Sequence, residues 1–318
     1  MTQPTVAVVD IGSNSIKLLV AAPGAGAGVE LRVLFQEALE TRISGGIGQG
    51  NSFLTEAGMV AGVRAVTRLL ELAKPYAPTH QVLVATSAVR DAANRANFAE
   101  RILAATGTTL EILSGDDEAL LIARGIATDP ALRGAKEFCL ADLGGGSLEC
   151  IRFAGGKIVQ AVSQPLGAVR LTEKFVREPQ APFASAARAA VDAETRRVVA
   201  LGGFQFPPGG RLVGTGGAFT VARGIFAHRL GFERRESWPA EMSRADLAGL
   251  LDEIAPLDAA GRARIPNLTP ERADILPAAL TTILALMDLA HVTGVTHSFH
   301  NLRFGVAARF FAQLRGEF

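Results

Sequence analysis

Cysteine is scarce in this 318-residue sequence, which contains only Cys139 and Cys150. Two thiols cannot build a disulfide framework, and their spacing does not form a CxxC metal pair, so disulfide-stapled scaffolds and metal modules of that kind are excluded. We interpret both as buried thiols. So little cysteine suits a reducing compartment, and we expect a cytoplasmic protein.

An excess of either charge is also missing. Lysine and arginine together number 32, aspartate and glutamate number 31, and the formal net charge is +1. The whole chain therefore has no electrostatic attraction to nucleic acid, and any basic site has to be a local patch. There is no basic N-terminal region followed by a long apolar run, and no stretch of about 18 apolar residues, so we expect neither a signal peptide nor a membrane span.

What the sequence does have is an ordinary globular composition, with 48% hydrophobic and 20% charged residues. Residues 5–22 have the pattern of a strand, a turn and a second strand, and residues 55–74 predict a helix with Thr55 as its N-cap. Residues 81–106 and 110–127 each have the pattern of a strand, a loop and a helix. This alternation predicts an α/β layer structure.

The length suits two domains, and the pattern restarts after the segment 124–137. We predict a first lobe over residues 1–124 and a second lobe over residues 125–318. The last third is mostly helical, and we expect its final helix, residues 303–318, to pack back on the first lobe.

One short motif occurs twice. Residues 10–16 read DIGSNSI and residues 142–148 read DLGGGSL, so an aspartate, an aliphatic residue, a glycine, two small residues, a serine and an aliphatic residue recur at an offset of 132 residues. Each copy stands between apolar strand patterns. The match predicts two related lobes that face each other, each with a tight hairpin turn at the edge of a cleft.

Such a turn suits phosphate binding. Glycine and serine allow consecutive backbone N–H groups to turn inward and form a concavity for an anion, and the serine hydroxyl adds a donor. An aspartate beside phosphate would repel it, so Asp10 and Asp142 are better explained as ligands of a divalent cation that bridges to phosphate. An ordinary glycine hairpin would explain one copy alone, but two copies, each with its carboxylate, favour phosphate binding.

A third glycine loop, residues 214–217 (GTGG), follows a strand pattern and leads into a helix. Its N–H groups would lie at a helix N-terminus, which attracts anions, although a plain strand-to-helix connection would also explain it. Three such loops indicate a ligand with several phosphates. The predicted phosphate-binding residues are Gly12, Ser13, Asn14, Ser15, Gly144, Gly145, Gly146, Ser147, Gly214, Thr215, Gly216 and Gly217.

These motifs together resemble the exopolyphosphatase / guanosine pentaphosphate phosphatase family. The matching segments DIGSNSIKLLV, TSAVRDAANR, ILSGDDEALLIARG, DLGGGSLE, QPLGAVRLTEKF and VGTGGAFT follow one another in family order. The resemblance implies an α/β fold of two ribonuclease-H-like lobes, as in actin, sugar kinases and Hsp70-like proteins, with an interlobe cleft. Many relatives carry a further helical domain, and this sequence resembles the short two-domain type.

The resemblance also implies residue roles. Acids at the start of a predicted helix are explained by the helix dipole and by Ser114 as N-cap, but Glu118 aligns with the catalytic glutamate of the family. Arg90 lies in the segment that resembles the conserved-arginine motif and would clamp phosphate in a bidentate manner. Glu149 would join Asp142, and Asp10 as a further ligand, in holding Mg²⁺ or Mn²⁺. From its strand position alone, Glu149 could equally point to solvent.

Four further residues have two interpretations each. Arg42 and Arg303 either extend a basic lining or lie on the surface, and His297 and His300 either form a metal pair or are ordinary structural histidines, which we favour. Two departures from the family pattern are Phe304, where relatives usually have an acid, and Ala279, where they tend to have glycine.

The function predicted first is an exopolyphosphatase that hydrolyses the terminal phosphate of inorganic polyphosphate. A guanosine pentaphosphate phosphatase would use the same loops, but the single tryptophan and single tyrosine offer little to stack a purine. We also consider an actin-like kinase or ATPase, and a binder of polyphosphate or alarmone without catalysis. We expect no nucleic acid or membrane partner, and a homodimer is among the assemblies considered.

Overall fold

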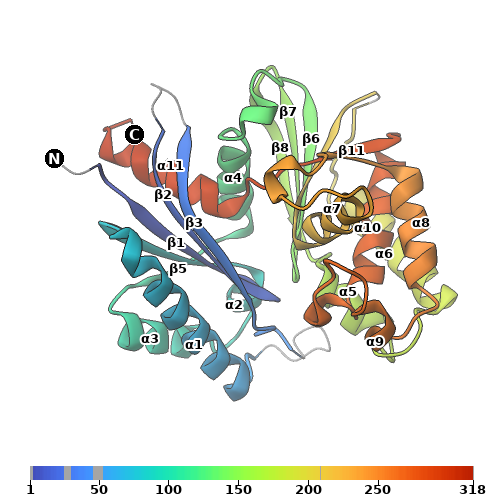
Figure 1. Ribbon diagram of the computed structural model, residues 1–318, viewed down its shortest axis with the longest axis horizontal. Coiled ribbons are helices and arrows are strands. Elements are labelled where there is room, and N and C mark those ends of the chain that lie inside the picture. The colour runs from blue at the N-terminus through green and yellow to red at the C-terminus, as the bar shows by residue number, and fades with distance from the viewer. Residues whose placement is uncertain (1–2, 25–29, 46–52, 208, 318) are drawn as a thin grey trace. The chain divides into compact units, whose positions relative to one another are not determined.

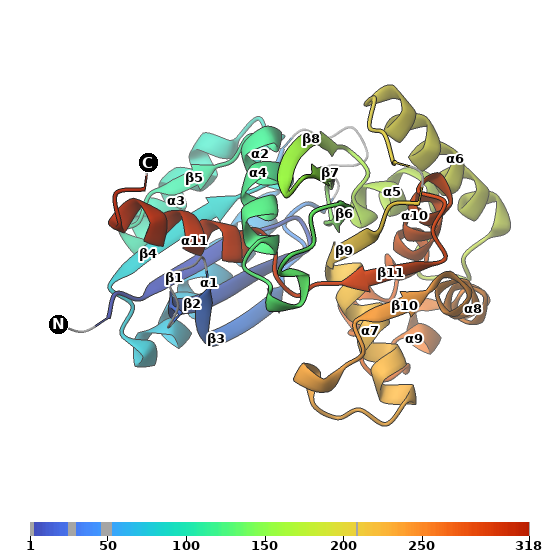
Figure 2. The same cartoon turned by 90° about the horizontal axis from the view of Figure 1, so that it is seen from above.

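The computed structural model describes residues 3–24, 30–45, 53–207 and 209–317, and it divides into two compact units (Figure 1). Unit 1 consists of the chain up to Gly134 together with His300 onward, and unit 2 is Ala135–Phe299. Each unit has its own sheet and its own helices (Figure 2).

Unit 1 is a five-stranded sheet with helices on both faces. Its described elements are β1 (Val6–Ile11), β2 (Ser15–Pro23), β3 (Leu31–Glu40), α1 (Glu56–Ala73), β4 (His80–Ala85), α2 (Ser87–Arg90), α3 (Arg95–Thr106), β5 (Leu110–Ile112), α4 (Gly115–Ile126) and α11 (Leu302–Leu314), with short 3-10 turns at Lys74–Tyr76 and Pro130–Leu132.

The strand order in unit 1 is β3-β2-β1-β4-β5. β1 pairs antiparallel with β2 and parallel with β4, so the first three strands form a meander and the last two join it in parallel. β1 is buried along its whole length, and because side chains alternate between the faces of a strand, Ala7, Val9 and Ile11 enter the apolar core with α1 and α3. Asp10 therefore lies on the opposite face, which α11 covers.

Helices α4 and α11 pack side by side with very close backbones. A Cβ on Gly305 would collide with the carbonyl oxygen of Leu121, and one on Gly125 would collide with that of Asn301. Glycine at these two positions allows the last helix of the chain to lie against α4.

The division of the chain differs from the predicted one. We predicted a boundary after residue 124, but α4 continues through Ile126 and is followed by a 3-10 turn whose Leu132 is buried, so the chain leaves unit 1 only after Gly134. Residues 300–318, which the predicted second lobe also included, belong to unit 1.

Unit 2 is a six-stranded sheet with strand order β10-β11-β9-β6-β7-β8. Its described elements are β6 (Phe138–Leu143), β7 (Leu148–Ala154), β8 (Lys157–Gln164), α5 (Ala168–Phe175), α6 (Ser185–Leu201), β9 (Leu212–Gly216), α7 (Gly217–Arg229), β10 (Glu241–Ser243), α8 (Arg244–Ile254), α9 (Ala259–Arg262), α10 (Leu276–Leu289) and β11 (Gly294–His297), with 3-10 turns at Arg235–Ser237 and Pro270–Arg272.

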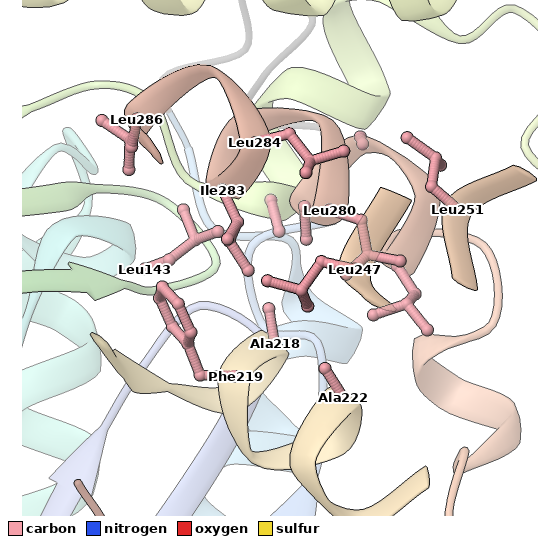
Figure 3. Close-up of a cluster of buried hydrophobic side chains, with 14 of the residues drawn as sticks. Leu143, Ala218, Phe219, Ala222, Leu247, Leu251, Leu280, Ile283, Leu284 and Leu286 are labelled. Atoms are coloured by element: carbon pink, nitrogen blue, oxygen red, sulfur yellow. The ribbon is translucent and has the colours of Figure 1, made fainter. Parts of the chain in front are cut away.

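The core of unit 2 surrounds α10, whose sequence LPAALTTILALMDL is apolar on nearly every side, as expected for a helix buried all round. Figure 3 shows Leu280 and Ile283 of this helix beside Phe219 of α7 and Leu143, the last residue of β6. The core thus reaches the point where β6 enters the triple-glycine loop.

The two sheets repeat one plan. β6, β7 and β8 form an antiparallel meander that β9 and β11 join in parallel, in the same arrangement as β1, β2, β3, β4 and β5. β10 is an addition at the edge of the second sheet. The internal repeat predicted from the two motifs is therefore a repeat of topology as well.

The crossing of α4 and α11 can be tested with Gly305→Ala. We expect the free energy of unfolding to fall by about 3 kcal/mol, because the new methyl group forces apart two helices that are in backbone contact. Urea unfolding followed by circular dichroism measures this. Gly249→Ala in α8 is the matched control, since nothing lies within 4 Å of its Cβ position. That control should be neutral or stabilising by up to about 1 kcal/mol, and equal losses for both variants would contradict the packing.

Candidate functional site

The two motif copies form hairpins with the same register. In the first, Asp10 pairs with Lys17, and in the second Asp142 pairs with Glu149. Each turn is closed by one backbone hydrogen bond, from Gly12 N to Ser15 O at 3.2 Å and from Gly144 N to Ser147 O at 3.0 Å. Because the first glycine N–H of each loop closes the turn, the prediction narrows to the amides of the three following residues, 13–15 and 145–147, as donors to an anion.

The first loop is held by the segment that follows β3. The carbonyl of Asn14 accepts hydrogen bonds from the backbone N–H groups of residues 41 and 42, at 2.9 and 2.8 Å. The carbonyl of Ser13 accepts from Ser44, both from its N–H at 3.3 Å and from its hydroxyl at 3.1 Å. In a trans peptide the C=O and the following N–H point in opposite directions. The N–H groups of Asn14 and Ser15 therefore point away from this segment.

Side chains complete the support of the first loop. Arg42 Nε donates to Asn14 Oδ1 at 3.2 Å, and Asn14 Nδ2 donates to Glu40 Oε2 at 2.6 Å. The hydroxyls of Ser13 and Ser87 are hydrogen-bonded at 3.2 Å. Arg42, predicted either to line the site or to lie on the surface, thus contacts the loop through the Asn14 side chain.

The second loop is held by α5. The carbonyls of Gly144 and Gly145 accept hydrogen bonds from the backbone N–H groups at the start of α5, and Arg170 Nε donates to the carbonyl of Gly146 at 2.8 Å. The helix approaches so closely that a Cβ on Gly167 would collide with the backbone of Gly145. Both loops are therefore tied from one side by their carbonyls.

The third glycine loop has a structural reason for each of its glycines. A Cβ on Gly214 would enter the ring of Phe219, and one on Gly217 would collide with the guanidinium of Arg272. Gly216 has φ of 102°, a left-handed conformation that favours glycine, and is the N-cap of α7. Packing alone therefore requires these glycines, and the contact of this loop with phosphate, including that of Thr215, stays a prediction.

Asp142 and Glu149 form a pair of carboxylates in the second hairpin. They are directly opposite in the β6–β7 ladder, so both side chains extend from the same face of the sheet, and both are buried. Ser163, the next residue in this row, donates its hydroxyl to Glu149 Oε1 at 2.7 Å. Glu149 is thus buried rather than pointing to solvent. Two like charges facing each other across a ladder are unfavourable unless a cation is shared.

Asp10 has a different neighbour, because Lys17 occupies the place that Glu149 has in the second hairpin. Asp10 is buried, and its Oδ1 has no hydrogen-bond partner among the described residues. Burial raises its pKa above the ordinary 3.8, while the charges of Lys17 and Arg303 act in the opposite direction. A buried carboxylate oxygen without a partner is unfavourable, which is expected where a ligand completes the site.

Glu118 and Arg90 are brought together in unit 1. Arg90 is at the end of α2, and its Nη1 donates to Glu118 Oε2 at 2.6 Å and to the carbonyl of Leu113 at 3.3 Å. Glu118 is in the first turn of α4, whose N-cap is Ser114 as predicted, and its side chain is only 7% exposed. The acids beside it, Asp116 and Asp117, are less buried. Among the three acids of this helix start, Glu118 is the one that is buried and ion-paired with Arg90.

The remaining predicted residues have structural partners. Arg303 is buried, and its Nη1 donates to the carbonyl of Leu18 at 2.7 Å. His300 is hydrogen-bonded to Thr128 at 2.7 Å and stacks on Phe304, with 3.9 Å between ring centroids. This stacking gives Phe304 a packing role at the position where relatives usually have an acid.

His297 belongs to unit 2, whereas His300 belongs to unit 1. His297 is buried against Arg223, and burial lowers its pKa well below the ordinary 6.5. Within residues 3–24, 30–45, 53–207 and 209–317, no group of three or more histidine, cysteine, aspartate or glutamate side chains could hold a metal ion. The structural interpretation of both histidines is the one that their contacts support.

Sequence reasoning missed the residues that hold the loops. Ser87, Glu40 and Arg170 contact the loops directly, and Gly167 permits the approach of α5. The segment QPLGAVRLTEKF resembles the family, but nothing in it indicates that its glycine faces another glycine loop. A glycine that directly precedes a predicted helix without a side-chain cap is the signal that could have indicated a backbone contact there.

The topology and the paired hairpins define an α/β protein of two ribonuclease-H-like units, in the actin-like fold group. A crystal structure of an exopolyphosphatase from Cytophaga hutchinsonii matches it with a TM-score of 0.85 at 24% identity, over 98% of each chain. A crystal structure of the Aquifex aeolicus member of the Ppx/GppA family matches with a TM-score of 0.78 at 21% identity, over 98% of this chain and 99% of that one. These likenesses confirm the predicted fold class.

A profile of the Ppx/GppA phosphatase family matches residues 19–312. Exopolyphosphatase 2 of Mycobacterium tuberculosis is 31% identical over 320 residues, covering 96% of this chain and 98% of that protein. The chain belongs to the Ppx/GppA phosphatase family, as its motifs predicted. In the described part of the chain, none of the helices has the length and apolar character needed to cross a membrane.

The burial of Asp10 has a consequence for stability. Its folded pKa lies above the unfolded one, so the native state binds the extra proton between the two values and stability falls as pH rises through that window. Asp10→Asn should therefore raise the free energy of unfolding at neutral pH, and the gain should shrink toward the ordinary pKa of 3.8. Urea unfolding over a pH series measures this, and a variant less stable than the parent at neutral pH would contradict it.

Proposed function

We propose that this protein is an exopolyphosphatase, which uses water to release orthophosphate from the end of an inorganic polyphosphate chain. The observation that carries the proposal is the second hairpin, where the amides of residues 145–147 follow a strand with a buried carboxylate pair. Anion donors and metal-ligand carboxylates side by side suit a substrate made of linked phosphates. The likeness to the Mycobacterium tuberculosis protein named Exopolyphosphatase 2 supports the same substrate.

The residues fit a divalent cation of the Mg²⁺ type. Mg²⁺ takes one or two protein carboxylates and leaves its other positions to water and phosphate oxygens, which agrees with the pair Asp142 and Glu149. Asp10 keeps its predicted place as a further ligand because its Oδ1 lacks a hydrogen-bond partner in the described chain. When bound, Mg²⁺ or Mn²⁺ would neutralise phosphoryl charge.

Glu118 is the proposed general base. Arg90 holds one of its carboxylate oxygens at 2.6 Å and so fixes the orientation of the side chain. Glu118 accepts a proton from the water that attacks the terminal phosphorus, the bridging P–O bond breaks, and the shortened chain leaves with the bond's electron pair. Such reactions depend mainly on positioning and on neutralisation of charge. The proposal requires that the loops of both units act on one substrate.

Guanosine pentaphosphate hydrolysis is the second candidate activity within the same family. Orthophosphate release from polyphosphate, guanosine pentaphosphate and ATP, each with Mg²⁺ and with a chelator, decides between the activities. We expect polyphosphate to have the highest kcat/KM and the chelator to abolish release. A clear preference for guanosine pentaphosphate would assign the second activity, and a preference for ATP would reject both.

Removal of the proposed base gives the first mutational test. Glu118→Gln should lower kcat about 10³-fold with little change in KM, since a general base contributes roughly 10² to 10⁴ in rate and is not needed to bind the substrate. Asp117→Asn is the matched control on the exposed side of the same helix turn and should behave like the parent. A Glu118→Gln enzyme with near-parental kcat would remove Glu118 as base.

The carboxylate pair gives a metal test. Glu149→Gln should raise the Mg²⁺ concentration needed for half-maximal activity by about tenfold or more, because one of two proposed ligands loses its charge. Phosphate release across a Mg²⁺ titration measures this. Glu178→Gln, an exposed acid of the same unit, should leave the titration unchanged, and the same midpoint for Glu149→Gln and the parent would contradict the assignment.

A further inference from the structure

We propose that Arg170 is the positioning residue of the second phosphate loop, and that it acts by fixing the direction of the Gly146–Ser147 peptide. This inference rests on the proposed function, because it assigns the loop amides to phosphate. Arg170 itself contacts the loop backbone and is not assigned to the substrate.

The starting point is the uncapped N-terminus of α5. The first N–H groups of any helix lack partners within the helix, and this helix has no side-chain cap. Here the loop supplies the acceptors. Ala168 N donates to Gly144 O at 2.9 Å, and Val169 N and Arg170 N both donate to Gly145 O, at 2.9 and 3.2 Å.

The helix backbone thus holds two successive carbonyls, and the third is held by a side chain. Arg170 Nε donates to Gly146 O at 2.8 Å. Carbonyls of successive residues alternate in direction in a strand, but here those of residues 144, 145 and 146 all accept from α5. Glycine tolerates the backbone conformations that this requires.

The consequence for the amides follows from peptide geometry. Since N–H and the preceding C=O point in opposite directions across a trans peptide, the N–H groups of Gly145, Gly146 and Ser147 point away from α5. Three amides turned to one side form the concavity that binds an anion. The helix fixes the first two of these amides, and Arg170 fixes the third.

The first loop supports the same interpretation by comparison. There, too, the carbonyls are tied back, but the carbonyl of Ser13 is held by the N–H and the hydroxyl of Ser44. Arg42 reaches the Asn14 side chain rather than a loop carbonyl through its Nε. A serine thus does for the first loop what the Arg170 side chain does for the second, next to the carboxylate pair.

The test compares Arg170→Ala, Arg170→Lys and the parent, with Arg177→Ala as an exposed control beyond the same helix. We expect Arg170→Ala to lower kcat for polyphosphate about 30-fold and to change KM less than about threefold, because one lost anion donor costs up to roughly 10² to 10³ in rate. Guanidinium ion added to Arg170→Ala should restore part of kcat, and Arg170→Lys should retain more activity than Arg170→Ala. Arg177→Ala should match the parent.

A merely structural role would give a different pattern. Equal losses in kcat and in urea midpoint, with no rescue by guanidinium, would overturn the inference, as would parental kinetics for Arg170→Ala. A second readout does not need turnover: the backbone amide resonance of Ser147 should shift on titration of the parent with inorganic phosphate and shift less in Arg170→Ala. If the parent does not hydrolyse polyphosphate, the proposed function fails, and this titration alone decides on Arg170, with equal shifts in both proteins contradicting it.

Discussion

The arrangement of the candidate site depends on the planarity of the peptide group, in which C=O and the following N–H are opposed. Both loops use this constraint in the same way. Carbonyls that would otherwise remain without partners accept hydrogen bonds from a neighbouring segment, residues 41–44 in unit 1 and the start of α5 in unit 2. The amides on the other side of the same peptides are thereby aligned. Neither loop needs a positively charged side chain to present donors to an anion.

The duplication preserved this backbone device and changed the charges beside it. The hairpin register is the same at an offset of 132 residues, yet Asp10 is opposite Lys17 whereas Asp142 is opposite Glu149. Unit 1 thus combines a carboxylate with protein cations and with the ion pair of Arg90 and Glu118. Unit 2 combines two carboxylates and suits an external cation. On the proposed function, unit 1 supplies the base and unit 2 holds the metal.

Much of the fold could be predicted because its signals are local. Apolar strands, the caps Thr55 and Ser114, and the repeated motif are readable from spacing alone. The site was predictable in its residue types, but the contacts between distant segments were not. The ion pair of Arg90 with Glu118 joins residues 28 apart, and the contact of Arg170 with Gly146 joins residues 24 apart. Nor could spacing show that Gly214 and Gly217 are required by the Phe219 ring and the Arg272 guanidinium.

The limits of the first unit illustrate the same point. The end of α4 and the buried Leu132 move the division from residue 124 to Gly134, and the glycine contacts between α4 and α11 explain why the end of the chain returns to unit 1. Each depends on packing of surfaces that a linear pattern does not contain. The helix 302–314 has an apolar face, but its partner is set by two glycines 180 residues apart, Gly125 and Gly305.

A crystal structure with a non-hydrolysable, methylene-bridged polyphosphate and Mg²⁺ tests the central claim most directly. The account predicts phosphate oxygens about 2.7–3.2 Å from the amide nitrogens of residues 145–147 and 13–15, with the metal on Asp142 and Glu149. Phosphates bound only by lysine and arginine side chains, with those amides turned elsewhere, would contradict it.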